Sequence, residues 1–226
     1  MIKAAIFDVD GTILDSMSIW NNAAEMFLRS MGIKAETGLG KIMFSMNMTE
    51  GAEFLKNRYE LDMDKDEIIT GINNTIKYFY NYHVQLKEGV KKFLKDMKQA
   101  GIRMTAATSS DRHVVEEALK RLNVISYFDR IFTCTEVGAG KVKPDIYLAA
   151  AGYMGTLPKD TWVFEDALYA IRTAKNAGFR TVGVYDFSSI ENIEEIKETC
   201  DIFLSKLNDF HGLIEKINER YKDEGN

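Results

Sequence analysis

The sequence has few of the residues that mark secreted, zinc-binding or membrane proteins. Its 226 residues include two cysteines, Cys134 and Cys200, which lie far apart and form no CxxC pair. We therefore expect two free thiols in a reducing, cytoplasmic setting. The three histidines are scattered and give no zinc-binding pattern. No apolar run approaches the roughly 20 residues of a membrane-spanning helix, and the first residues lack a signal-peptide pattern.

A surplus of positive charge is also absent. The formal net charge is −5, and acidic and basic residues are mixed along the chain. Proteins that bind nucleic acid usually carry a basic stripe or patch, so we expect no nucleic-acid partner. The chain is 46% hydrophobic and 28% charged, which is typical of a soluble globular protein. Nothing in the sequence indicates an obligate dimer, so we expect a monomer. Because no apolar run is long enough to span a membrane, we also expect no membrane partner.

Six short apolar runs alternate with helical patterns over most of the chain. They are residues 4–7, 104–107, 130–132, 162–164, 181–184 and 202–204. The first run, AAIF, is continuous, as expected of a central strand that is covered on both faces. A helical stripe from Val90 to Met97 ends at Gly101, and another begins at Pro144. This alternation predicts an α/β fold with a doubly wound parallel sheet.

The stretch between the first strand and the helix near residue 90 breaks this alternation. It carries two segments with apolar side chains at helical spacing, and Asp64 and Glu67 stand in capping-box order before the second. It shows no convincing strand pattern. We therefore predict an inserted all-α domain, with a single decorated α/β domain as the alternative. The predicted domains are an α/β core of residues 1–15 and 87–226 and a helical insertion of residues 16–86.

Polar residues follow four of the predicted strands at the point where each strand ends. They are Asp8, Asp10, Gly11 and Thr12, then Thr108, Ser109 and Ser110, then Lys141 and Lys143, and finally Glu165 and Asp166. Parallel sheets bind ligands beyond these carboxyl ends. Converging carboxylates repel one another unless a cation lies between them, and a set of oxygen ligands favours Mg²⁺.

A phosphoryl group is the ligand that best suits the neighbours of such an ion. Thr108 is expected to donate to a phosphate oxygen, and Lys141 to neutralise charge in the transition state. Gly11 allows backbone N–H groups to approach the anion closely. Each motif alone has an ordinary structural explanation as a turn or a helix cap. Their joint order along the chain is what indicates a phosphoryl-transfer site.

In this order the motifs resemble those of the haloacid dehalogenase superfamily of phosphotransferases. The similar branch is the one that includes β-phosphoglucomutase and phosphoglycolate phosphatase. The matching residues are DVDGT at 8–12, Thr108, Lys141 ahead of Pro144 and Asp145, and the acidic pair Glu165 and Asp166. The resemblance covers nearly the whole chain. It implies a Rossmann-like core with a helical cap domain inserted after the first motif.

The resemblance also implies a mechanism and a role for each site residue. Asp8 is expected to form an aspartyl-phosphate, and Asp10 to act as general acid and then general base. The implied Mg²⁺ ligands are Asp8, the main-chain carbonyl of Asp10, and Asp166, with Glu165 as a direct or indirect helper. The implied phosphate contacts are Gly11, Thr108, Ser109 and Lys141. Lys143 lies close to Lys141 and is an alternative for its role.

Residues of the insertion bear on which reaction the chain catalyses. Trp20 stands where mutases of this branch carry a histidine, and Lys41 is the only cation of the methionine-rich loop 41–51. Both are candidate substrate-specificity residues. These departures favour a Mg²⁺-dependent phosphatase of a small phosphorylated metabolite over a β-phosphoglucomutase-like mutase. Asp10 argues against a phosphonatase, while a non-catalytic phosphate binder and a receiver domain stay as alternatives.

Overall fold

The computed structural model describes residues 2–43, 46 and 48–222. The chain divides into two compact units, Met1–Asp15 with Gln85–Asn226, and Ser16–Val84. The first is an α/β unit and the second is a helical unit. The helical unit spans almost the same residues as the predicted insertion, and its role as a cap domain stays a prediction. Among the described residues, no helix has both the length and the apolar character needed to cross a membrane.

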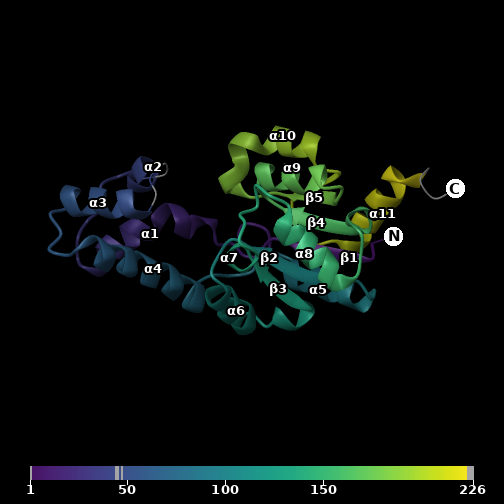
Figure 1. Cartoon of the computed structure of the whole chain (residues 1–226), viewed down its shortest axis with the longest axis horizontal. Coiled ribbons are helices and arrows are strands. Elements are labelled where there is room, and N and C mark those ends of the chain that lie inside the picture. The colour runs from purple at the N-terminus through teal and green to yellow at the C-terminus, as the bar shows by residue number, and fades with distance from the viewer. Residues whose placement is uncertain (1, 44–45, 47, 223–226) are drawn as a thin grey trace. The chain divides into compact units, whose positions relative to one another are not determined.

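A six-stranded sheet forms the centre of the α/β unit (Figure 1). Its order is β3 (Arg130–Thr133), β2 (Arg103–Thr108), β1 (Ala4–Phe7), β4 (Thr161–Glu165), β5 (Arg180–Val184) and β6 (Ile202–Leu204), and all neighbours are parallel. Each strand coincides with one of the six apolar runs. The predicted α/β fold with a doubly wound parallel sheet is therefore confirmed. The order of the strands reverses between β1 and β4, which is the point where such sheets bind ligands.

Helices cover both faces of this sheet. They are α5 (Val90–Gln99), α6 (Arg112–Arg121), α7 (Cys134–Val137), α8 (Asp145–Met154), α9 (Leu168–Asn176), α10 (Ile193–Thr199) and α11 (Phe210–Arg220). Three 3₁₀ helices span Ile125–Tyr127, Pro158–Asp160 and Phe187–Asn192.

Side chains of β1 alternate between the two layers of the core. Ile6 belongs to the cluster that includes Tyr147 of α8. Phe7 stacks on Phe164 of β4 at 4.3 Å between ring centroids, and Phe164 contacts Phe93 of α5. A strand that is covered on both faces presents polar groups only where it ends. The core therefore confines the chemistry of β1 to the residues that follow Phe7.

The helical unit consists of α1 (Met17–Ser30), α2 (Leu39–Met43), α3 (Met48–Arg58) and α4 (Lys65–Tyr82). Helix α1 packs on α2 and α4, and α3 packs on α4. The predicted capping box is confirmed, since Asp64 Oδ1 accepts from the Glu67 N–H and Glu67 Oε2 accepts from the Asp64 N–H, both at 2.8 Å. None of the unit's described residues lies in a strand. In the methionine-rich loop 41–51, residues 44, 45 and 47 lie outside the described part of the chain.

Candidate active site

Asp8 lies one residue beyond β1, in a buried charge cluster. Its N–H donates to the Phe164 carbonyl at 2.9 Å, which brings Asp8 next to Glu165 at the end of β4. The Lys141 ammonium donates to Asp8 Oδ1 and, at 2.6 Å, to Glu165 Oε1. In the described part of the chain, the buried Asp8 Oδ2 has no hydrogen-bond partner. Lys141 therefore binds one oxygen of Asp8, and the other oxygen is available to bind a cation or to attack an electrophile.

Three buried carboxylates converge at this point. Asp8, Glu165 and Asp166 each offer an oxygen, and these oxygens lie within 4.8 Å of one another. Burial raises the pKa of Asp8 to about 8; Lys141 opposes that rise, whereas the charges of Glu165 and Asp10 add to it. Burial, followed by the charges of Asp8 and Glu165, raises the pKa of Asp166 well above its usual value. The cluster is short of positive charge, and its oxygen-only donors fit a hard divalent cation.

Lys141 is the buried cation of the cluster. Burial lowers the pKa of its ammonium, but the charges of Asp8 and Glu165 outweigh burial and hold that pKa well above its usual value. Lys141 therefore stays charged at neutral pH. The Lys143 side chain, in contrast, is exposed. Of the two lysines that the sequence left as alternatives, Lys141 is the one that lies among the acids.

Four donors orient the Glu165 side chain. Its Oε1 accepts from Lys141 and, at 3.1 Å, from the Tyr147 hydroxyl. Its Oε2 accepts from the N–H groups of Asp166 at 3.1 Å and Ala167 at 3.2 Å. Both oxygens are engaged within the protein, so the most direct effect of Glu165 is to place the Lys141 ammonium beside Asp8.

Asp10 belongs to a second hydrogen-bonded group that links three strand ends. Its Oδ2 accepts from the Ser110 hydroxyl at 2.7 Å and from the Thr108 hydroxyl at 3.3 Å. Thr108 Oγ1 in turn accepts from the Ser110 N–H at 3.0 Å. Thr12 Oγ1 donates to Asp166 Oδ1 at 3.3 Å. These contacts hold the residues after β1 against those after β2 and β4. A general acid–base group needs this kind of fixed orientation.

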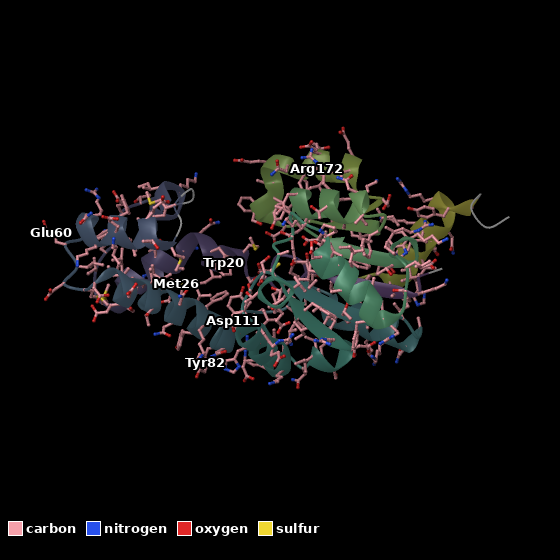
Figure 2. The ribbon with its side chains drawn as sticks, in the orientation of Figure 1. Trp20, Met26, Glu60, Tyr82, Asp111 and Arg172 are labelled. Carbon is pink, nitrogen blue, oxygen red and sulfur yellow. The ribbon has the colours of Figure 1, made fainter. Side chains whose placement is uncertain are left out.

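The remaining predicted site residues fall in both units. Gly11 has φ +86°, a conformation that favours glycine. Ser109 follows Thr108, and its hydroxyl lies 3.4 Å from the Cys134 sulfur. Trp20 and Lys41 belong to the helical unit. Trp20 is on α1 with 47% of its surface exposed (Figure 2). The roles assigned to these residues stay predictions.

Three residues contact the site although the sequence did not single them out: Lys87, Tyr147 and Asp186. A fourth, Ser110, was named among the polar strand-end residues but was given no role, and it binds Asp10. Ser110 and Asp186 both follow strands, so the rule that pointed to the other polar strand ends also covers them. The apolar spacing of α8 indicates only a core position for Tyr147. Lys87 stands before a helix, where no motif marks it.

Comparisons with known proteins agree with this arrangement. The family model described as haloacid dehalogenase-like hydrolase matches residues 5–184. A phosphorylated carbohydrates phosphatase of Thermotoga maritima is 26% identical over 181 residues, which cover 80% of this chain and 84% of that protein. The β-phosphoglucomutase of Bacillus subtilis is 30% identical over 224 residues, which cover 92% and 95%. A solved Thermotoga maritima structure, described as a candidate β-phosphoglucomutase, shares the fold with a TM-score of 0.83 at 23% identity, covering 96% of this chain and 100% of that one.

Proposed function

The chain belongs to the haloacid dehalogenase-like hydrolases, and from that membership we propose that it is a Mg²⁺-dependent phosphatase of a small phosphorylated metabolite. One observation carries this proposal. Buried Asp8 has one oxygen on Lys141 and, among the described residues, no hydrogen-bond partner for the other, inside a cluster of three acids. This is the environment of a nucleophilic carboxylate rather than of a structural ion pair.

Hydrolysis proceeds in two transfers. In the first, an Asp8 oxygen bonds to phosphorus while the bond from phosphorus to the leaving oxygen breaks, and Asp10 gives its proton to that oxygen. In the second, a water oxygen bonds to phosphorus, the bond to Asp8 breaks and Asp10 takes a proton from the water. Inorganic phosphate leaves, and both aspartates return to their starting states. Ser110 and Thr108 hold the Asp10 carboxylate for both proton transfers.

Residues around Asp8 bind the ion and the phosphoryl group. Asp8, Asp166 and the main-chain carbonyl of Asp10 are the proposed Mg²⁺ ligands, and Glu165 supports them through Lys141. The ion, when bound, offsets the negative charge of the carboxylates and the phosphoryl oxygens. The proposed phosphate contacts are Gly11, Thr108, Ser109 and Lys141. In this proposal the fixed Lys141 ammonium neutralises the charge that develops on the phosphoryl oxygens, which lowers the barrier to transfer.

The proposed setting is the cytoplasm. Cys134 and Cys200 are both free thiols in the structure, in agreement with a reducing compartment. The named relatives support substrates in the class of small phosphorylated carbohydrates. We propose that the protein acts as a monomer on such a molecule, without nucleic acid or membrane.

The test is release of inorganic phosphate from a panel of sugar phosphates, phosphoglycolate and nucleotides in the presence of Mg²⁺. We expect release that stops with EDTA and with Asp8→Asn. Asp66→Asn, the same change at an exposed aspartate of α4, serves as the control and leaves release unchanged. Failure of every compound with folded, Mg²⁺-loaded protein would contradict the proposed phosphatase.

A sugar-phosphate mutase is the second candidate. It is favoured by 30% identity to the β-phosphoglucomutase of Bacillus subtilis over 92% of this chain. Trp20 in place of a histidine and the scarcity of cations near Lys41 favour the phosphatase. The two reactions give different products from β-glucose 1-phosphate supplied with a trace of the bisphosphate. A mutase yields glucose 6-phosphate, whereas a phosphatase yields glucose and inorganic phosphate.

A further inference from the structure

Lys87 joins two strand-end loops of the α/β unit through its ammonium group. Its Nζ donates to the Gly11 carbonyl at 2.6 Å, to the Tyr185 carbonyl and, at 2.9 Å, to Asp186 Oδ2. Its own N–H donates to the Ile13 carbonyl at 2.9 Å. The Lys87 side chain is 19% exposed and that of Asp186 is 8% exposed. A largely buried ammonium therefore connects the residues after β1 to those after β5.

We propose that Lys87 is a positioning residue that fixes the peptide between Gly11 and Thr12 for the reaction at Asp8 and Asp10. This inference rests on the proposed function. The C=O and N–H of a trans peptide point in opposite directions, so the contact of Lys87 with the Gly11 carbonyl also sets the direction of the Thr12 N–H. Glycine restrains its backbone least of all residues. The Gly11 N–H donates to the Leu14 carbonyl at 3.0 Å, and Lys87 adds a restraint on the carbonyl side of Gly11.

The peptide that Lys87 fixes lies between two residues of the site. Asp10, on one side, has its carboxylate on Thr108 and Ser110. Thr12, on the other, donates its hydroxyl to Asp166. Rotation of this peptide therefore moves Asp10, the proposed general acid–base residue, together with Thr12, which contacts the proposed metal ligand Asp166. A displacement of about 1 Å at such groups costs on the order of 10²-fold in rate.

Lys87 also contacts the Tyr185 carbonyl and Asp186, and the effect of the Asp186 ion pair has to be separated from that of the Gly11 contact. Asp186 Oδ1 accepts from the N–H of Ser188 at 2.9 Å and from its hydroxyl at 2.7 Å, so this carboxylate is held in place without Lys87. Removing Lys87 alone leaves a buried carboxylate without its ammonium partner, which destabilises the fold. Replacing Asp186 by asparagine at the same time removes that charge and leaves two lost contacts as the difference, those with the Gly11 and Tyr185 carbonyls, of which only the first is in the site.

The experiment compares Lys87→Met/Asp186→Asn with Asp186→Asn alone. We expect kcat of the double variant to fall by about 10- to 100-fold with KM within about threefold of wild type, and Asp186→Asn to stay within about threefold in both. Lys175→Met is the matched control, because Lys175 also bridges a main-chain carbonyl, that of Thr199, and an aspartate, Asp201. It should leave kcat unchanged. If the double variant does not fold, Lys87→Gln/Asp186→Asn replaces it under the same criteria.

A second measurement does not depend on turnover. In ¹H–¹⁵N spectra, the Thr12 amide resonance should move in the double variant and stay in place in Asp186→Asn. A double variant with wild-type kcat and an unmoved Thr12 resonance would overturn the proposal and reduce Lys87 to a charge partner of Asp186. If the wild-type protein hydrolyses no substrate, the proposed function fails, and the Thr12 resonance alone then decides the role of Lys87.

Discussion

The metal-free protein should lose stability as the pH rises, because its buried acids hold protons that the unfolded chain releases. Burial raises the pKa of Asp8 from 3.8 to about 8. A folded-state pKa above the unfolded value contributes stability that is complete below about pH 4 and is lost as the pH rises through about 8. Each proton held only by the folded state lowers the free energy of unfolding by about 1.4 kcal/mol per pH unit.

Two residues contribute to this slope near neutral pH. Asp8 accounts for about 1.4 kcal/mol between about pH 6 and pH 7, because its pKa lies above this interval. Burial and the charge of Asp8 also raise the pKa of Asp166 well above its usual value, so Asp166 adds to the loss of stability in the same direction. A bound divalent cation keeps both carboxylates ionised and removes the loss.

Urea unfolding at these two pH values, in EDTA and in Mg²⁺, measures the effect. We expect the free energy of unfolding to fall between the two pH values in EDTA and to change much less in Mg²⁺. Asp8→Asn should remove about 1.4 kcal/mol of the fall in EDTA. Asp66→Asn, at an exposed position, should remove none. A fall in EDTA no larger than in Mg²⁺, or one that Asp8→Asn leaves intact, would refute the assignment of raised pKa values to the cluster.

Two further predictions concern packing and hydrogen bonding. Tyr147→Phe removes a 3.1 Å hydrogen bond to Glu165 and should lower kcat several-fold while costing about 1 kcal/mol of stability. Tyr153→Phe, at an exposed ring, is the control. Equal kcat in the two variants would contradict a role for Tyr147. Gly71→Ala should destabilise the helical unit by about 1–3 kcal/mol in thermal unfolding, because its Cβ would meet the Phe27 ring at 2.2 Å. Gly152→Ala, with open space around its Cβ in α8, should instead stabilise by about 0.5–1 kcal/mol; the opposite order would be evidence against this packing.

The sheet and its polar edge were predictable because their signals are local. A strand buried on both faces needs a continuous apolar run, and such runs stand out as short units such as AAIF. The capping box of α4 needs only two residues three positions apart, Asp64 and Glu67. Asp8 directly follows β1 and Glu165 is the last residue of β4, so a correct strand assignment also places both acids at the carboxyl ends of neighbouring strands.

The contacts that complete the site were not predictable, because they join residues far apart in the chain. Lys87 meets Gly11 across 76 positions and Asp186 across 99. No spacing rule connects such residues before the fold is known. Tyr147 was missed for a different reason. Tyr147 fits the apolar pattern of α8 whether or not its hydroxyl has a hydrogen-bond partner. Only the folded structure shows that the hydroxyl donates to Glu165.

The charged side chains of the cluster around Asp8 are buried, so an excess of one sign among them is costly. The buried carboxylates of the cluster are Asp8, Glu165 and Asp166, and the Lys141 ammonium contacts the first two of them. When all three carboxylates are ionised, three negative charges against one positive charge leave two in excess, the charge that one divalent cation offsets. Burial is the main cause of the raised pKa of Asp8 and of Asp166, and the neighbouring negative charges add to it. Lys87 and Asp186 offset each other beside this cluster, so the effect expected of Lys87 on the site is transmitted by the Gly11 peptide.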